Sequence, residues 1–201
     1  VGMVLKERLQ VQNASAYYTG CVAPDSVHMA SRPIDKATRW SAHARHGNLK
    51  QWTAQAKALF DTRPSDANPD FWQGYLLHLL TDIAWDAGEH DPIWFAMKQR
   101  NLPPLSNRGA GWDDCFRFDY QQMQATWWCY EVRPALLAAQ ADDMPGLPAR
   151  TIVAFAHKVA GKPCECEGSP CPPYMVDEAC VRRLAESVWA LLTCKNEESA
   201  E

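Results

Sequence analysis

The chain contains no run of basic residues, and its 201 residues carry a formal net charge of −4 with a pI near 5.9. Proteins that bind a nucleic-acid backbone present a stripe of Lys and Arg, so such partners are not expected and small-molecule partners are favoured. No apolar stretch reaches the roughly 18 residues of a membrane span, and no charged segment followed by an apolar one opens the sequence. We therefore expect no transmembrane helix. A cytoplasmic location is favoured, with secretion after signal-peptide removal as the alternative.

Sustained alternation of β-branched residues is also absent, as are internal repeats and a boundary that would divide the chain. Helical signals dominate instead, and a hydrophobic content of 47% is ample to fill one core. The sequence therefore predicts an all-α, single-domain helical bundle over residues 1–195, followed by a flexible acidic tail at residues 196–201.

The predicted helices cover about residues 2–13, 41–60, 69–87, 91–99, 114–139, 148–160 and 176–194. Ser41 is a reasonable N-cap for the second helix, which places His43 in its first turn. Pro134 is expected to kink the fifth helix. Residues 19–40 are expected to form an irregular segment that crosses the surface of the bundle.

The helix over residues 69–87 carries the most informative pattern in the chain. Asn68 is a good N-cap, Pro69 suits the first helical position, and Gly88 provides a stop, so the helix is predicted without reference to its chemistry. Within this mostly apolar segment His78 and Asp82 lie four residues apart and therefore on one face. A helix that is apolar on nearly every side belongs at the centre of a bundle, so both side chains are expected to be buried.

Burying an imidazole and a carboxylate without partners costs roughly 2 to 7 kcal/mol for a neutral polar group and more for a charge. Two arrangements satisfy these groups. One is a hydrogen bond between His78 and Asp82 in an ordinary core, and the other is a divalent metal bound by both. The second arrangement needs further ligands, because a catalytic zinc has about three protein ligands and one open position.

Three segments stand in order before this helix, namely residues 20–28 (GCVAPDSVH), residues 35–36 (DK) and residues 41–43 (SAH). Joined to residues 74–85 (GYLLHLLTDIAW), this order resembles the zinc-dependent phospholipase C family, most closely its small, uncharacterised bacterial members. The resemblance covers roughly residues 16–90. It implies a bundle of the zinc-dependent phospholipase C and P1 nuclease type.

The resemblance also implies roles for individual residues. His43, His78 and Asp82 would bind one zinc, Asp82 would be able to bridge to a second ion, and Asp25 would be the catalytic carboxylate that handles the attacking water. Imidazole nitrogen and carboxylate oxygen suit zinc, which lowers the pKa of water to about 7 and polarises a phosphoryl oxygen. The implied activity is hydrolysis of a phosphodiester or phosphomonoester, with a lipid or another small molecule as substrate.

One departure from the family pattern leaves a second function open. Family members use an N-terminal amino group and a histidine of the first helix to bind a further zinc, whereas here no histidine precedes His28. One or two zinc ions are therefore expected rather than three. A catalytically degenerate metal-binding or structural module of the same fold is the alternative to the phosphoesterase.

Further candidates each have an ordinary alternative. His28 follows Asp25 by three residues and either contacts the substrate phosphate or the metal shell, or is a surface histidine. Asp119 lies on the long fifth helix, from which it could close the site on the opposite side. His46 either adds a ligand or is solvated, and His90 either adds a ligand or belongs to an exposed loop.

A second group of potential ligands is independent of the first. Cys164, Cys166 and Cys171 lie in a loop rich in Pro and Gly, and Cys180 follows nine residues later. Three states are open to these residues, namely a structural zinc site, a disulfide, or free thiols. Their spacing matches no standard pair of cysteines separated by two residues.

Overall fold

A computed structural model of the chain describes residues 1–29, 35–106, 108–161 and 172–194. Within these ranges every regular element is a helix and no strand occurs, so the predicted all-α class is confirmed. None of the described helices is long and apolar enough to cross a membrane. The predicted acidic tail at residues 196–201 lies outside the described residues.

Most elements are α-helices, η1 is a 3₁₀-helix, and η2 and η3 are π-helical turns. In chain order they are α1 (Gly2–Leu5), α2 (Ala14–Val22), η1 (Ala23–Met29), α3 (Lys36–Ala42), α4 (Leu49–Asp61), α5 (Pro69–Ala84), η2 (Trp85–Glu89), α6 (His90–Gln99), α7 (Ala110–Met123), η3 (Trp128–Val132), α8 (Arg133–Leu137), α9 (Ala149–Gly161) and α10 (Glu178–Thr193).

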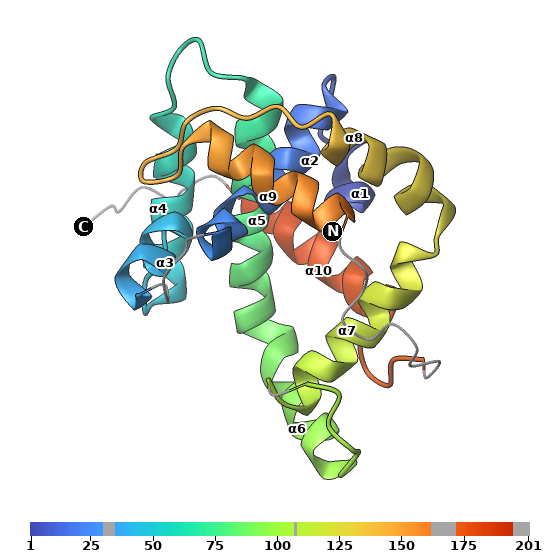
Figure 1. The fold of residues 1–201 in the computed structure, drawn as a ribbon. Helices are drawn as coiled ribbons and strands as arrows, with labels where there is room; N and C mark the ends of the chain where they lie inside the picture. The colour runs from blue at the N-terminus through green and yellow to red at the C-terminus, as the bar shows by residue number, and fades with distance from the viewer. Residues whose placement is uncertain (30–34, 107, 162–171, 195–201) are drawn as a thin grey trace, which may run out of the picture.

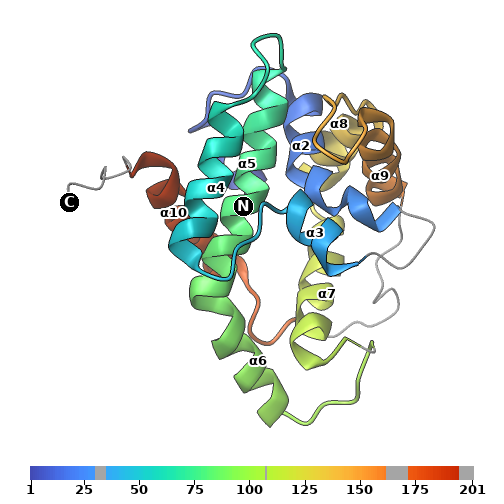
Figure 2. The same cartoon turned by 90° about the vertical axis from the view of Figure 1, so that its left-hand side faces the viewer.

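Helix α5 runs through the middle of the molecule, with α2, α4 and α10 packed around it (Figures 1 and 2). The side-chain oxygen of Asn68 accepts hydrogen bonds from the backbone N–H groups of Asp70 and Phe71, so the helix begins where the capping pattern predicts. Beyond Ala84 the chain widens into the π-turn η2 and continues as α6. The predicted helix over residues 69–87 is thus confirmed, except that residues 85–87 belong to the π-turn η2.

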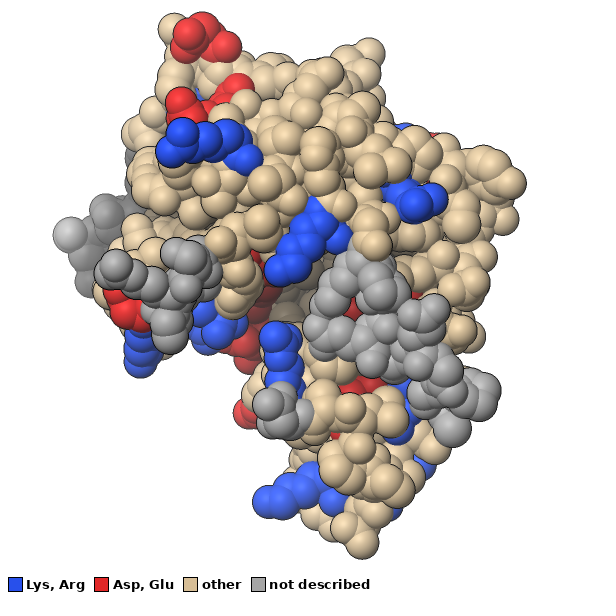
Figure 3. All heavy atoms as spheres, viewed as in Figure 1, with Lys and Arg blue, Asp and Glu red and all other residues tan. Residues whose placement is uncertain are grey.

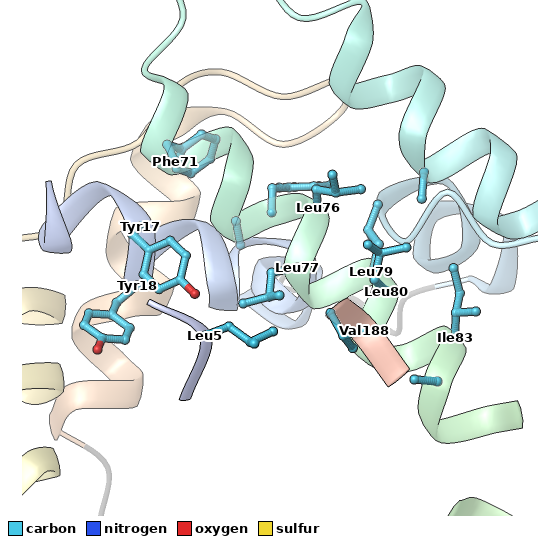
Figure 4. Close-up of a cluster of buried hydrophobic side chains, with 14 of the residues drawn as sticks. Leu5, Tyr17, Tyr18, Phe71, Leu76, Leu77, Leu79, Leu80, Ile83 and Val188 are labelled. Carbon is cyan, nitrogen blue, oxygen red and sulfur yellow. The ribbon is translucent and has the colours of Figure 1, made fainter. Parts of the chain in front are cut away.

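The core gathers on α5 and the helices that cross it (Figure 4). Leu79 and Leu80 are completely buried, and so is Phe71 near the start of α5. Side chains from three other helices meet them, namely Leu5 of α1, Tyr17 and Tyr18 of α2, and Val188 of α10. Because α5 is covered on nearly all sides, a polar group on it must find its partner inside the protein or where part of the helix is left exposed.

Two glycines let α2 and α5 approach at backbone distance. A methyl group at Gly74 would stand 2.1 Å from the carbonyl oxygen of Tyr17, and one at Gly20 would stand 2.0 Å from the carbonyl oxygen of Phe71. Neither distance is compatible with a side chain, so only glycine allows this crossing. The contact brings the end of α2, and the η1 turn that follows it, against the face of α5 that carries His78.

The first half of the chain differs from the prediction in its helix boundaries. The predicted helix over 2–13 was wrong beyond its first turn, because α1 ends at Leu5 and Gln10 adopts a left-handed conformation (φ 55°). The next helix, α2, begins only at Ala14, where Asn13 caps it by accepting a hydrogen bond from the N–H of Ala16. The expected irregular segment 19–40 is instead largely helical, because α2 extends to Val22 and η1 and α3 follow.

Candidate metal centre

Three elements bring the predicted site residues together. The 3₁₀-helix η1 carries Asp25 and His28, the chain leaving α3 carries His43, and the middle of α5 carries His78 and Asp82. These residues span more than fifty positions of sequence, yet all of them lie at one place. The packing of α2 and η1 against α5, and of α3 against η1, produces this convergence.

His78 is oriented by the end of α2. Its Nδ1 lies 2.8 Å from the carbonyl oxygen of Cys21, which can only accept a hydrogen bond, so this nitrogen carries the hydrogen and donates it. In the neutral imidazole Nε2 then has a free lone pair. That atom lies 3.8 Å from Oδ2 of Asp82, one turn further along α5.

His43 is oriented in the same manner by its own helix. Its Nδ1 lies 2.9 Å from the carbonyl oxygen of Arg39, and its Nε2 lies 3.4 Å from Oδ1 of Asp25 and 3.8 Å from Oδ2 of Asp82. The imidazole rings of His43 and His78 meet edge to face, with their centroids 5.3 Å apart. Both Nε2 atoms therefore face the same two carboxylates.

The backbone around His43 is fixed by two buried aromatic side chains. The indole Nε1–H of Trp52 donates to the carbonyl oxygen of His43 at 2.8 Å, and the hydroxyl of Tyr75 donates to the carbonyl oxygen of Ala42 at 2.5 Å. His43 follows the last residue of α3 rather than lying in the first turn of a helix begun by Ser41, so that prediction was wrong. The next helix, α4, begins only at Leu49.

Three distances between an imidazole and a carboxylate are close to the ligand spacing of a tetrahedral ion. Asp25, His43 and His78 each offer one ligand atom, and these atoms lie within 4.8 Å of one another. Two ligands about 2.05 Å from a tetrahedral zinc stand roughly 3.3 Å apart, and the 3.4 Å and 3.8 Å separations of Asp25 and Asp82 from the imidazoles are close to that value. The sequence assigned Asp25 to the attacking water, whereas its position also makes it a potential ligand.

The cluster is closed on the imidazole side and open on the carboxylate side. The side chains of His43 and His78 are 6% and 14% exposed, whereas those of Asp82 and Asp25 are 37% and 42% exposed. Both His78 and Asp82 were expected to be buried, but neither is fully buried: the His78 side chain is mostly covered and that of Asp82 is partly exposed. An opening beside the carboxylates is what a catalytic site needs, because it leaves room for water or substrate.

The electrostatics of the cluster favour a cation. Burial opposes ionisation of Asp25, but the hydrogen bond with His43 and the charges of His78, His43 and His28 outweigh it and hold the pKa of this carboxyl well below its ordinary value. Burial lowers the pKa of His78, but the carboxylates of Asp82 and Asp25 together raise it by more, so the pKa of His78 lies above its ordinary value. Two carboxylates facing two imidazole lone pairs therefore attract positive charge, either as protons or as a metal ion.

Basic side chains surround the opening. Nε2 of His28 lies 3.7 Å from Oδ1 of Asp25, and the imidazole is 45% exposed, so it stands at the mouth of the cluster. Burial and the positive charges of Arg39 and Arg108 lower the pKa of His28. The carboxylate of Asp25 raises it, but by less. Figure 3 shows acidic atoms within a hollow at the middle of this face, with Lys and Arg side chains around it.

Other sequence candidates lie elsewhere. Asp119 lines a different hollow of about 440 Å³ with Phe118 of α7 and Arg182 of α10. His90 stacks on the indole of Trp94 and contacts the carboxylate of Asp91. His46 accepts a hydrogen bond from the backbone N–H of Asn48 and lies in the turn between α3 and α4.

Of the four cysteines in the second predicted group of ligands, the structure describes only Cys180. Cys164, Cys166 and Cys171 lie outside the described residues, so the predicted alternatives for them stay open. Cys180 is a buried free thiol on α10. Its sulfur lies 3.4 Å from a carboxylate oxygen of Glu89, and burial, followed by the charge of Glu89, raises the pKa of the thiol to about 12.

Sequence reasoning missed the residues that support the cluster. Trp52 and Tyr75 hold the turn at His43, and the carbonyl of Cys21 holds His78, but none of these contacts leaves a pattern in the sequence. Gly20 and Gly74 did leave one, because an isolated glycine inside an apolar helical segment indicates a close backbone approach.

Comparison with known proteins adds no assignment: no protein-family model, no curated protein and no solved structure matches this chain.

Proposed function

We propose that the protein is a metal-dependent phosphoesterase that resembles zinc-dependent phospholipase C, with its metal held by His43, His78 and Asp82 and with Asp25 beside them as the catalytic carboxylate. The observation that carries the proposal is the orientation of the two imidazoles. Each gives its Nδ1–H to a backbone carbonyl and turns Nε2 towards the same two carboxylates. Metal-binding histidines have this arrangement, in which an outer hydrogen bond fixes the ring and its tautomer.

The donor set favours zinc among the common divalent ions. Magnesium and calcium prefer shells made of oxygen ligands, whereas two imidazole nitrogens with one or two carboxylate oxygens suit zinc. The cluster in the described residues fits one ion, and the exposed side of Asp82 leaves this carboxylate able to reach a second. We therefore propose one or two zinc ions.

Residues in and around the cluster have different roles in phosphoester hydrolysis. When bound, zinc supplies Lewis-acid activation of a phosphoryl oxygen and of water. Asp25 stays ionised because its pKa is held low, and it faces both the cluster and solvent, so its carboxylate can orient the attacking water. Attack forms one P–O bond and breaks the P–O bond to the leaving alcohol. Arg39 and Arg108 place positive charge where the anionic phosphate enters.

Activity with defined substrates tests the proposal. The purified protein should hydrolyse a nitrophenyl-phosphocholine or nitrophenyl phosphate, lose the activity with a chelator and regain it with zinc. The variant His78→Ala should stay inactive with zinc, whereas His46→Ala, a histidine outside the cluster, should keep its activity. Zinc-loaded protein that turns over neither substrate, nor phospholipid in micelles, would contradict the phosphoesterase.

The alternative is a metal-binding or structural module of the same fold without catalysis. It is favoured by the lack of a histidine before His28, because the family uses one for a further ion. Zinc binding without turnover in the assays above would support this alternative. The open carboxylate side and the basic residues around it favour the enzyme, since a structural zinc site is closed by its protein ligands.

A further inference from the structure

A buried arginine lies away from the candidate metal centre with unused hydrogen-bond donors. Arg117 of α7 is only 6% exposed, and among the described residues its Nε and Nη1 have no hydrogen-bond partner. Its guanidinium carbon lies 5.4 Å from the centre of the Tyr174 ring, a contact with the face of the ring that satisfies neither N–H group. A buried guanidinium without a partner is costly and calls for one.

Two carboxylates that lie one helical turn earlier on α7 are engaged elsewhere. Asp113 accepts hydrogen bonds from the N–H of Leu105 and the hydroxyl of Ser106, at 2.9 Å and 2.6 Å. Asp114 accepts three backbone N–H groups from residues 174–176, at 2.7 to 2.9 Å. Among the described residues neither forms an ion pair with Arg117, although both lie one helical turn before it. Asp113 thereby holds residues 105–106 in place, and Asp114 holds residues 174–176.

Arg117 lines a cavity of about 200 Å³. The cavity lies between the end of α6, the start of α7 and the connection of these helices, at the lower end of the molecule in Figure 2. Lys98 brings a second positive charge to its wall and Asn101 an amide, and Leu102 and Pro103 contribute apolar surface. Asp113 also lines the cavity, and its carboxylate is engaged by the N–H of Leu105 and the hydroxyl of Ser106. The volume is several times the roughly 30 Å³ that one water occupies in the liquid.

We propose that this cavity is a binding site for a small oxyanion, a carboxylate or a phosphate, with Arg117 as its buried anchor and Lys98 at its edge. An anion would supply acceptors to the N–H groups that lack them and would offset the buried charge. The site is independent of the metal centre, whose residues do not line this cavity.

Calorimetric titration of the full-length protein with inorganic phosphate and with acetate, at constant ionic strength, tests the proposal. Binding of at least one anion is expected, and it should persist in the presence of a chelator and in His78→Ala, which separates it from phosphate bound at a metal. Arg117→Gln should weaken binding about tenfold or more, because it removes a charge-assisted hydrogen bond. Lys98→Gln should weaken it less, and the matched surface variant Arg182→Gln should not change it.

A second measurement keeps the test decisive if Arg117→Gln does not fold. In the wild-type protein the Nε–Hε resonance of Arg117, followed by ¹⁵N NMR, should move on addition of the anion that binds. The variant Lys98→Gln should require a higher anion concentration for the same movement. Absence of heat and of resonance movement up to tens of millimolar phosphate and acetate would overturn the proposal and leave the cavity to water. Binding that disappears with the chelator would overturn it as well, because that result places the anion at the metal centre.

Discussion

At the scale of single residues, the candidate centre depends on which ring nitrogen of each histidine is free. The carbonyl oxygens of Arg39 and Cys21 take the Nδ1–H groups of His43 and His78, so both Nε2 atoms are left to face Asp25 and Asp82. An isolated His–Asp hydrogen bond would need only one imidazole. The second imidazole, held in the same tautomer and aimed at the same carboxylates, is what separates this cluster from an ordinary core contact.

His78→Ala should remove most of the bound metal. Loss of a direct ligand should weaken zinc binding by more than the ~10 to 100-fold that loss of an outer hydrogen-bond partner causes. Elemental analysis by mass spectrometry after dialysis measures this. His46→Ala serves as the control, because His46 bonds only to the turn at Asn48. Unchanged zinc content in His78→Ala would exclude the assigned ligand set.

Asp25→Asn separates two roles of this carboxylate. If Asp25 orients the attacking water, the variant keeps zinc on His43, His78 and Asp82 and loses about 10² to 10⁴ in turnover, the usual range for a general base. Turnover of a nitrophenyl phosphoester and zinc content are measured on the same sample. Loss of zinc would make Asp25 a ligand, in keeping with its 3.4 Å distance from Nε2 of His43. Wild-type turnover would exclude both roles.

At the scale of elements, the crossing of α2 and α5 positions the centre. Gly74→Ala would place a methyl group 2.1 Å from the carbonyl oxygen of Tyr17, so the helices must move apart. We expect a loss of roughly 2 kcal/mol in the free energy of unfolding, typical of overpacking, and weaker zinc binding because His78 loses its support from Cys21. Chemical denaturation and zinc titration measure the two effects.

Gly88→Ala is the matched control for this variant, because a methyl group at Gly88 meets nothing within 4 Å. It replaces a glycine of η2 by a residue with less freedom in the unfolded chain, so the free energy of unfolding should stay the same or rise slightly. Equal unfolding free energies for Gly74→Ala and wild-type protein would contradict the importance of the α2 and α5 contact.

A second link between elements has a defined pH dependence. Glu131 of η3 accepts hydrogen bonds from Lys6, which follows α1, and from the Tyr18 hydroxyl of α2, and these contacts hold the pKa of Glu131 below its ordinary value. Because the folded pKa is lowered, the contribution to stability is complete above the unfolded pKa of about 4.3 and is lost as the pH falls through the folded pKa.

Glu131→Gln should therefore lower the free energy of unfolding at pH 7 by about 1 kcal/mol, since the carboxylate is partly exposed, and should have little effect near pH 3. Denaturation with urea at both pH values measures the difference. Glu7→Gln, at an exposed position beside Lys6, provides the control. A loss of the same size at both pH values would mean that the link acts by packing rather than by charge.

A helix whose ends are marked by clear capping residues was predictable from the sequence. A helix boundary was not predictable where more than one residue could act as the cap. Asn68 and Pro69 specify the start of α5, and it begins there. The sequence predicts Ser41 as the cap of the helix that carries His43, whereas in the structure Asp35 caps α3 by accepting the N–H of Thr38. Propensity alone could not decide between them, because the anchoring of this turn by Tyr75 comes from a helix more than thirty residues later.

The predicted long helix over 114–139 shows the same limit. Pro134 was expected to kink it, and the chain instead leaves the helix after Met123 and widens into the π-turn η3 before α8. Proline lacks an N–H and its ring clashes with the carbonyl four residues earlier, and a π-turn just before it removes that clash. The sequence thus indicates that the helix is disturbed, whereas the position of the break follows from packing.

At the scale of the whole molecule, residues from three regions of the chain form one site on the central helix. The sequence predicted the members Asp25, His43, His78 and Asp82 through their order and their resemblance to a family pattern. It did not predict the distances of 3.4 to 3.8 Å that separate the imidazoles of His43 and His78 from these carboxylates, which depend on backbone contacts between α2 and α5. Asp119, a further candidate, faces another hollow, because α7 presents it towards α10 rather than towards η1.

The chain also carries a second group of potential zinc ligands in its cysteines, so zinc content alone does not locate the metal. X-ray absorption at the zinc edge of the full-length protein reports the ligand atoms directly. The proposed centre predicts a first shell of nitrogen and oxygen at about 2.0 to 2.1 Å, with the outer-ring signature of two imidazoles that is lost in His78→Ala. A shell dominated by sulfur near 2.3 Å, unchanged by that substitution, would contradict the proposed metal centre and place the zinc on the cysteines.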